Sequence, residues 1–585
     1  MSNIAAGVAA GGVNFRKYPT IKIEGKVVKG WDDIWNKILN DESAARIVAV
    51  DCYVGVDVDE IIKSAEGRMK VVDTRALFRT PKEVEDMTAA DVTDDAIFGY
   101  ITRLNLVDFF DPEKLSYAVE RIGNCKNVVV IGPGAFLAAP AATTRVYADM
   151  ARWEIQLRMK KKQVSGLGVE NRHEDFNLQY KRGFFVDWRV CDKHKKAFFE
   201  KSDYLLDTTQ PGEPKLADMA TMKNGLKQAA RQPFSFKPYF DPGPWGGHWL
   251  EEVCDLPTDD VPNYAWCMNC VAEENSLLFD IEGEIIEIPG IDLVFFETTS
   301  LLGEAVEGRF GKEFPIRFDF LDTMDGGNLS LQVHPDITYI QEKFGMHYTQ
   351  DESYYLLDAK EDASVYLGFK ENVDVDEMFD KLKQANVNGG DFDADAYVNK
   401  FPARKHDHFL IPSGTIHCSG KNSLVLEISA TPFIFTFKLW DWGRLGLDGK
   451  PRPINIEHGY QVINRERDTA YAKKELINVF EKVGEGPGWT EERTGLHRRE
   501  FIETRRHWFT GKVEHDCHGS VNVLMLVEGE QAVIESPSNQ FAPFVINYAE
   551  TIVIPASVEK YTISPYGKSE GKKLATIKAF VRTKA

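Results

Sequence analysis

The chain has 585 residues, enough for about three to five domains. Its composition, 43% hydrophobic and 27% charged, is that of an ordinary globular protein and excludes a wholly disordered chain. The formal charge of −20 argues against a nucleic-acid or membrane-surface partner, because such a surface repels phosphate backbones and anionic lipids. A small anionic substrate needs only a local positive pocket and stays possible.

The chain start and the cysteines indicate the compartment. Residues 1–20 lack a basic start and a strong apolar core, so we expect a flexible lead-in and not a signal peptide. No apolar run approaches the length of about 18 residues that a transmembrane helix needs. Eight thinly spread cysteines predict free thiols and a cytoplasmic location. The lone pair Cys267 and Cys270 predicts buried structural thiols rather than a zinc ribbon.

The front region, residues 1–215, has an α/β pattern. Apolar strand-like runs over 46–56 and 126–135 alternate with the helical stretch 111–124, and 145–162 begins as a strand and continues as a helix. Strands that alternate with helices predict a parallel sheet. Residues 205–245, rich in Pro and Gly, predict a connector, and we assign residues 216–300 to the connector and the entry strands of the next domain.

Short β runs separated by turns dominate the rest of the chain and predict sandwiches or barrels. We expect one β domain over 301–455 and a second over 456–585. A helical insert near 374–400 interrupts the first, with Met378, Phe379, Leu382 and Ala385 on one face.

One set of side chains predicts a metal site. Gln332 and His334 lie two apart on a strand, so both side chains can face one cavity. Glu352 follows on the next expected strand, and His417 ends the turn Pro-x-Gly-x-x-His. Two imidazoles, a carboxylate and an amide oxygen suit Zn²⁺ or a similar divalent ion. The alternative is four unrelated polar residues in a β core.

The motifs around this set resemble type I mannose-6-phosphate isomerases. They comprise QVHP, the Glu352 segment, PxGxxH, the strand around Glu427, the WDW-R segment, and upstream WGG (245–247) and FPIRFDFLD (314–322). The resemblance covers about residues 235–585 and implies a double cupin fold. It implies one Zn²⁺ per chain at Gln332, His334, Glu352 and His417. It also implies interconversion of mannose 6-phosphate and fructose 6-phosphate.

The chain departs from this family's pattern at three places. Gln350 and Asp319 stand where the family commonly has Lys, and Lys438 stands near a position where it often has Arg. Each change removes or alters a cation near an anionic substrate. The sugar-phosphate preference is therefore open.

Three residues are candidates for the chemistry. Isomerisation passes a proton between C1 and C2 and needs a base, charge stabilisation and a phosphate anchor. Glu427 is the candidate base, or a carboxylate in a structural network. Lys438 is the candidate cation for the oxyanion or phosphate, or a solvated lysine. Arg444 serves the phosphate or pairs with Asp441.

The last β block resembles a second cupin unit without the metal. Its IPASVEK repeats the turn IPSGTIH, but Lys560 replaces the ligand equivalent to His417. We expect one metal site, and we interpret His515 and His518 as a surface turn.

The front region resembles a P-loop kinase of the uridine-kinase type. DCYVGVD (51–57) follows a strand where the phosphate loop would stand, but it lacks the Lys-Ser/Thr pair. The basic stretch 180–196 resembles the lid of such a kinase. We expect a degenerate, non-catalytic kinase-like domain.

The sequence thus predicts a Zn²⁺-dependent aldose–ketose isomerase acting on a small phosphorylated sugar. The competing hypothesis is a non-catalytic sugar-phosphate sensor on the same cupin pair, favoured by the lost cations. Oligomeric state stays open.

Overall fold

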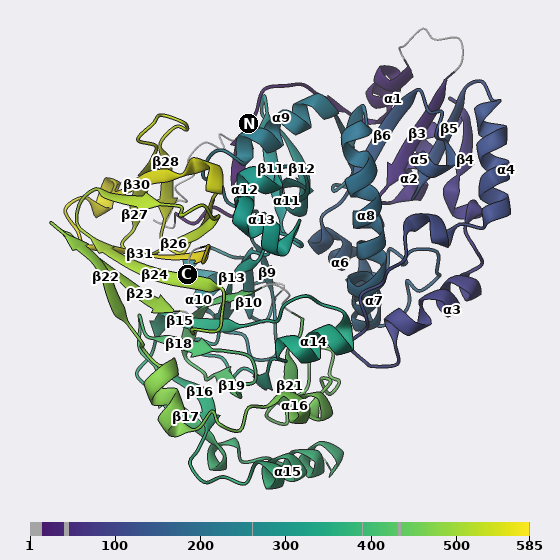
Figure 1. The fold of residues 1–585 in the computed structure, drawn as a ribbon. Coiled ribbons are helices and arrows are strands. Elements are labelled where there is room, and N and C mark those ends of the chain that lie inside the picture. Colours follow the sequence, from purple (N-terminus) through teal and green to yellow (C-terminus); the bar gives the residue numbers. More distant parts are fainter. Residues whose placement is uncertain are drawn as a thin grey trace.

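A computed structural model of the chain describes residues 14–39, 46–259, 261–388, 390–430, 434–495 and 497–583. Most of the expected N-terminal lead-in, residues 1–13, lies outside these ranges. Figure 1 shows an α/β unit in purple and blue, two β units in green and yellow, and a small sheet with short helices between them.

The α/β unit is built on a seven-stranded sheet. Its strands, from one edge to the other, are β2 (Val27–Lys29), β8 (Lys215–Asp218), β7 (Tyr204–Asp207), β6 (Thr144–Asp149), β3 (Ile47–Cys52), β5 (Val128–Gly132) and β4 (Lys70–Asp73). The helices are α1 (Trp31–Leu39), α2 (Val58–Ala65), α3 (Pro81–Val92), α4 (Pro112–Gly123), α5 (Ala135–Ala138), α6 (Arg152–Lys160), α7 (Phe176–Arg182), α8 (Trp188–Phe198) and α9 (Met219–Ala229). A π-helical turn, Gly183–Asp187, joins α7 to α8.

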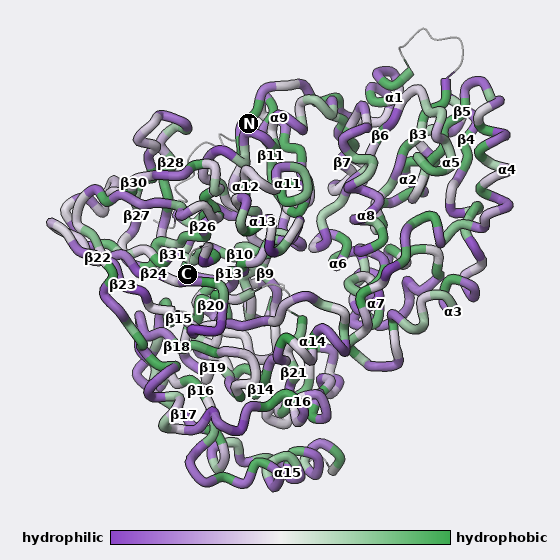
Figure 2. The backbone as a smooth tube through the Cα atoms, in the orientation of Figure 1, coloured by the Kyte–Doolittle hydropathy of each residue, from purple (hydrophilic) through white to green (hydrophobic). Residues whose placement is uncertain are grey.

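Strands β4, β5, β3, β6 and β7 are parallel, as the alternating pattern predicted. β3 and β5 are buried along their whole length, which explains their continuous apolar sequences. Figure 2 shows the contrast between apolar strands and the mixed faces of the surrounding helices. The loop after β3 leads directly into α2, where the Asp57 side chain accepts a hydrogen bond from the Glu60 N–H.

The expected connector at 205–245 is largely part of the α/β unit. β8 pairs antiparallel with β7, and α9 follows it at once, so the expected boundary at 215 falls at the start of a strand. The first Pro/Gly-rich stretch, residues 208–214, forms the turn between β7 and β8, and the second, residues 237–247, includes a strand of the next unit, Tyr239–Asp241. β7 and β8 have four residues each, which is too short to show a periodic pattern in the sequence.

A small sheet and three short helices lie between the α/β unit and the β units. The sheet contains β1 (Thr20–Lys22), β11 (Ser276–Ile281) and β12 (Glu284–Pro289), and the helices are α11 (Ile291–Phe296), α12 (Thr298–Leu302) and α13 (Glu304–Phe310). The Lys195 ammonium on α8 lies 2.8 Å from Asp149 and 2.8 Å from Asp292 on α11. This buried ion network joins the front unit to the rest of the chain.

The first β unit packs two sheets face to face. One contains β18 (His408–Ile411), β15 (Glu352–Ala359), β20 (Ser423–Ala430), β13 (Ile316–Asp322), β10 (Trp266–Cys270) and β9 (Tyr239–Asp241). The other contains β17 (Val398–Pro402), β16 (Ser364–Phe369), β19 (His417–Ser419), β14 (Leu331–Val333) and β21 (Phe437–Trp440). Short helices α10 (Trp249–Val253), α14 (Ile337–Phe344), α16 (Ile456–Val462) and α17 (Thr469–Tyr471) surround them.

The predicted helical insert is α15 (Val375–Asn388), at the outer end of this unit in Figure 1. Met378, Phe379, Leu382 and Ala385 are all buried, which confirms the predicted apolar face.

The C-terminal β unit also has two sheets. They are β22 (Glu481–Gly486), β23 (Trp489–Gly495), β24 (Ile502–Phe509), β31 (Leu574–Val581), β26 (Asn522–Glu528) and β29 (Thr551–Ile554), and β25 (Val513–Asp516), β30 (Lys560–Pro565), β27 (Gln531–Glu535) and β28 (Phe544–Asn547). Residues such as Leu524, Leu526 and Ile563 form its own core.

The prediction of a surface turn at 515–518 was wrong for His515. This residue is 5% exposed, and its ring stacks on Tyr561 at 5.0 Å, with His507 4.6 Å away. Val513 and His515 on β25, and Cys517 directly after it, are all buried. Alternate residues of this segment therefore point into the core. His518 is exposed, as predicted.

All eight cysteines lie among the described residues and are free, as predicted, and Cys267 and Cys270 are fully buried. No helix in the described ranges is both long and apolar enough to cross a membrane.

Candidate metal centre

The predicted ligands come from three strands and meet in the first β unit. On β14, Gln332 lies opposite His417 of β19 on one side and opposite Lys438 of β21 on the other. Directly opposed residues of antiparallel strands point to the same face. Glu352 begins β15 in the facing sheet, so its carboxylate approaches the two imidazoles from across the interior.

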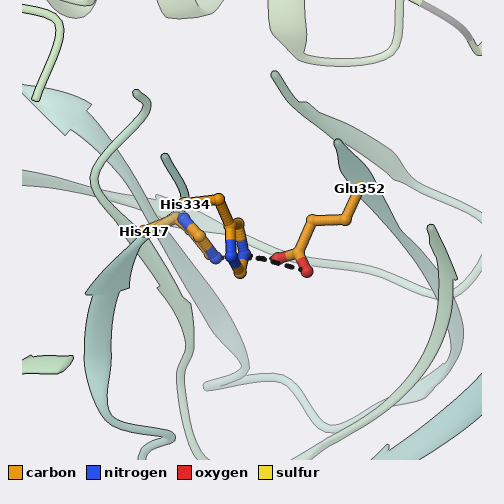
Figure 3. Close-up of side chains that lie close together, drawn as sticks. All are labelled: His334, Glu352 and His417. Atoms are coloured by element: carbon orange, nitrogen blue, oxygen red, sulfur yellow. Dashed lines mark ion pairs between the residues drawn. The ribbon is translucent and has the colours of Figure 1, made fainter. Parts of the chain in front are cut away.

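Figure 3 shows His334, His417 and Glu352 converging. His417 Nε2 lies 2.7 Å from Glu352 Oε1, and His334 Nε2 lies 3.1 Å from Glu352 Oε2. One ligand atom from each residue lies within 4.8 Å of the others. Gln332 Nε2 is 3.3 Å from His417 Nε2, so the Gln332 amide borders the same space. The structure therefore brings all four predicted ligands together.

Backbone carbonyls orient both imidazoles. His417 Nδ1 lies 2.8 Å from the Thr415 carbonyl oxygen, and His334 Nδ1 lies 3.1 Å from that of Phe435. A proton on each Nδ1 leaves each Nε2 with a lone pair directed at the centre. This arrangement is typical of metal-binding histidines.

The electrostatics of the centre favour an ionised carboxylate. Burial alone would raise the pKa of Glu352, but the imidazoles of His334 and His417 outweigh it and hold that pKa well below its usual range. Gln350 Nε2 donates a hydrogen bond to Glu352 Oε2 at 3.2 Å. This lowering requires a proton on the Nε2 atoms that face the carboxylate; a bound cation would take the place of those protons and likewise favour the ionised carboxylate.

The donor set fits a divalent metal ion. His334 Nε2 and Glu352 Oε1 are buried and make no hydrogen bond within the described chain. Two imidazole nitrogens and a carboxylate, together with the side-chain amide oxygen of Gln332, match the mixed ligands of a zinc site. Such a site keeps one coordination position for substrate.

Glu427 lies on the same interior face but is held by an ion pair. Its carboxylate contacts the Arg317 guanidinium, which also donates to Ser429 Oγ at 2.9 Å and lies 3.1 Å from Asp319. β13, β20 and β15 align Asp319, Glu427 and Tyr354 in one row. The structural network that the sequence left open for Glu427 is therefore present, and its role as a base stays a prediction.

Asp319 shares this network. Burial raises its pKa to about 6; Arg317 opposes the rise and the Glu352 carboxylate adds to it. Sequence reasoning treated Asp319 only as a lost lysine and missed Arg317. The alternation of FPIRFDFLD on one strand places residues 317 and 319 on one face and could have identified both.

Lys438 and Arg444 differ in their partners. Arg444 pairs with Asp441 at 2.7 Å, one of the two roles left open for it. Lys438 shares a face with Gln332, and its ammonium makes no hydrogen bond or ion pair within the described residues. Burial, with a smaller effect from the Arg452 guanidinium, lowers the pKa of Lys438 to about 7.

Phe435 connects the centre to the front unit. Its carbonyl accepts from His334, and its ring lies 5.0 to 6.2 Å from the rings of Phe344, Phe98, Phe185 and Phe184. Phe184 and Phe185 belong to the π-helical turn of the front unit. Aromatic packing between distant parts of the chain thus fixes the group that orients a metal ligand. No local sequence signal indicated this.

Comparisons with known proteins divide the chain. A family described as "Domain of unknown function (DUF8485)" matches residues 30–231. The mannose-6-phosphate isomerase of Streptococcus mutans is 28% identical over 221 residues, which are 37% of this chain and 64% of that protein. The mannose-6-phosphate isomerase ManA of Bacillus subtilis is 27% identical over 236 residues, 40% of this chain and 68% of that protein. The chain thus matches less than two thirds of the first of these relatives.

Solved isomerase structures resemble the fold in part. The mannose 6-phosphate isomerase from Bacillus subtilis matches with a TM-score of 0.46 and 19% identity, over 60% of this chain and 99% of that one. A zinc-bound mannose 6-phosphate isomerase matches with a TM-score of 0.45 and 17% identity, over 60% of this chain and all of that one.

Proposed function

We propose that this protein is a zinc-dependent aldose–ketose isomerase that interconverts mannose 6-phosphate and fructose 6-phosphate. The observation that carries the proposal is the buried convergence of His334, Glu352 and His417 beside Gln332, with both Nδ1 atoms held by carbonyls. Similarity to mannose-6-phosphate isomerases over 37 to 40% of the chain supports the choice of reaction.

Gln332, His334, Glu352 and His417 would hold the zinc ion. A bound ion would supply Lewis-acid polarisation of a substrate oxygen. The chain itself must move a proton between C1 and C2. The Asp319 carboxylate beside Arg317 is suited to this, since a buried acid with a pKa of about 6 can accept and return a proton near neutral pH. We propose that Glu427 or Asp319 is this base.

Lys438 would stabilise negative charge on the enediolate or on the phosphate. Its ammonium is free of partners within the described residues and shares the Gln332 face. Arg444 forms an ion pair with Asp441, so we assign it a structural role rather than binding of the phosphate.

The second candidate is a sugar-phosphate sensor without catalysis. Neutral Gln350 and the Asp319 carboxylate, in place of two lysines, leave few cations for a dianionic phosphate, which favours this alternative. In that case the metal would order the ligand only.

A coupled assay on mannose 6-phosphate separates the two. The isomerase predicts turnover that a chelator abolishes and that added Zn²⁺ restores. The sensor predicts metal-dependent binding of the sugar phosphate by calorimetry with no fructose 6-phosphate formed.

We propose that the front unit is a non-catalytic kinase-like domain. A strand, a short loop and a helix stand where a phosphate loop would lie, without its Lys-Ser/Thr pair. Asp51, at the end of β3, accepts backbone N–H groups of Gly134 and Phe136 and lies 2.9 Å from His194, so it is used structurally.

A further inference from the structure

A second polar cavity lies where helix α13 meets the C-terminal β unit, away from the metal centre. Its volume is about 580 Å³, within the range of ligand pockets. Its lining includes Arg309 of α13, Arg493 of β23, Arg505 of β24 and Arg582 after β31. Four guanidinium groups around one cavity contrast with the charge of −20 on the whole chain.

Two of these arginines are neutralised and two are not. Arg493 pairs with Glu481, and Arg505 pairs with Glu503 at 2.6 Å. Arg309 and Arg582 form no ion pair with any carboxylate in the described part of the chain. Arg582 donates to the carbonyl oxygens of Glu500 and Arg498, and Arg309 lies over the Phe501 ring at 4.9 Å.

One further carboxyl group, that of Glu500, lines the cavity near the two unpaired arginines. Glu500 lines the cavity, is 4% exposed, and its Oε1 has no hydrogen-bond partner within the described chain. Burial, with a smaller contribution from the Asp351 carboxylate, raises the pKa of Glu500 well above its usual range, although the Arg582 guanidinium opposes the rise. Burial and the Arg582 guanidinium also lower the pKa of Arg309, which reflects two like charges held together.

The cavity also has an apolar component. Phe501 and Phe580 line it, and the guanidinium of Arg505 lies 5.2 Å from the Phe580 ring. The ammonium of the buried residue Lys578, which does not line the cavity, lies 5.5 Å from the centre of the same ring. The walls therefore combine unpaired cations with flat apolar surfaces, which suits the charged group and the carbon skeleton of one small molecule.

We propose that this cavity binds a small organic anion, whose phosphate or carboxylate group is held between Arg309 and Arg582. Guanidinium groups bind both kinds of oxyanion through paired hydrogen bonds. The site is separate from the metal centre and gives the C-terminal β unit a binding role of its own.

Calorimetric titration of the full-length protein tests the site, with inorganic phosphate and succinate as probes. These two arms separate phosphate from carboxylate recognition. We expect at least one probe to bind the parent protein, and Arg309→Gln to weaken that binding about 10- to 100-fold, the effect of losing a charged hydrogen bond. Arg309→Lys, which keeps the charge but loses the fork, should fall between the two.

Two controls make the result specific. Arg121→Gln removes an exposed positive charge on α4 of the front unit and should leave the affinity within about twofold, because surface charges this distant are screened. His334→Ala removes a proposed metal ligand and should also leave it unchanged. Circular dichroism and thermal unfolding establish that each variant folds.

Several results would overturn the proposal. These are no binding of either probe to the parent, unchanged binding in Arg309→Gln, an equal loss in Arg121→Gln, or a loss in His334→Ala alone. The last result would place the anion at the metal centre. Because binding is measured without turnover, failure of the proposed isomerase activity leaves this test intact.

Discussion

Each β unit contains two buried histidines whose rings lie close together, and of these two pairs in the described chain the one in the first unit has a carboxylate against both rings. In the first unit, His334 and His417 face Glu352 at 3.1 and 2.7 Å. In the C-terminal unit, His507 and His515 lie 4.6 Å apart, and three of their ring nitrogens have no hydrogen-bond partner in the described chain.

A turn that both β units share by sequence accounts for part of this difference. Pro412 begins the turn that ends in the buried His417, whereas the matching turn from Pro555 ends in the exposed Lys560. The Glu352 carboxylate makes the first pair a site for a cation. In the C-terminal pair, burial lowers the pKa of His507 to about 4, although the Glu491 carboxylate on the neighbouring strand opposes this shift. A buried imidazole pair is thus not sufficient for a metal site.

The largest expected effect comes from removing a ligand of the first pair. His334→Ala and His417→Ala should lose the metal and lower turnover more than about 1,000-fold, since no other donor in the described chain replaces a buried Nε2. Elemental analysis and the coupled assay measure both. His507→Ala is the matched variant and should keep its metal. A metal content near one per chain in the two folded ligand variants would contradict the assignment.

Lys438 is expected to have the next largest effect. Lys438→Met keeps the length but removes the charge, and should reduce turnover about 100- to 1,000-fold, the cost of one transition-state donor. Lys438→Arg should keep most activity, and metal content should be unchanged in both. Turnover by Lys438→Met within about threefold of the parent would exclude a catalytic role.

The pH dependence sharpens this prediction. With a pKa near 7, the Lys438 ammonium is lost as pH rises through neutrality, so turnover that needs the cation should decline above about pH 7. Arginine stays protonated. The alkaline limb of the pH–rate profile should therefore move to higher pH in Lys438→Arg. An unmoved limb would assign that ionisation to another group.

The histidines of the C-terminal unit should affect stability and not turnover. The pKa of His507 lies below its unfolded value, so the unfolded state takes up the proton first and stability is lost as pH falls from about 6.5 to about 4. His507→Phe should reduce this acid-induced loss by up to about 3 kcal/mol. Denaturant unfolding at several pH values measures it. Substitution of the exposed His173 by Gln should leave the pH slope unchanged.

The smallest expected effect concerns the front unit, where we expect no ATP hydrolysis or phosphate transfer. Its loop after β3 lacks the cationic and hydroxyl groups that hold a nucleotide phosphate and its Mg²⁺. A sensitive phosphate-release assay checks this on the full-length protein. Turnover that disappears on changing Asp57 would contradict it, whereas Asp51 is a poor test because its loss would disturb the loop before α5.

The sequence predicted the ligand set because its signals are local. Gln332 and His334 are an i, i+2 pair, and His417 ends a recognisable turn. The ion pair between Arg317 and Glu427 joins residues 110 apart, so it depends on a strand register that spacing does not reveal. The burial of His515 was missed because polar neighbours in EHDCH resemble a turn, although they alternate on a strand.

The arrangement of Phe435 limits how this protein can be divided. The residue that orients His334 has its ring packed among aromatic side chains of the front unit. A shortened protein starting after α9 would expose that ring to water and free the peptide group that directs the imidazole. Separating the β units from the front unit would therefore disturb the orientation of the His334 imidazole.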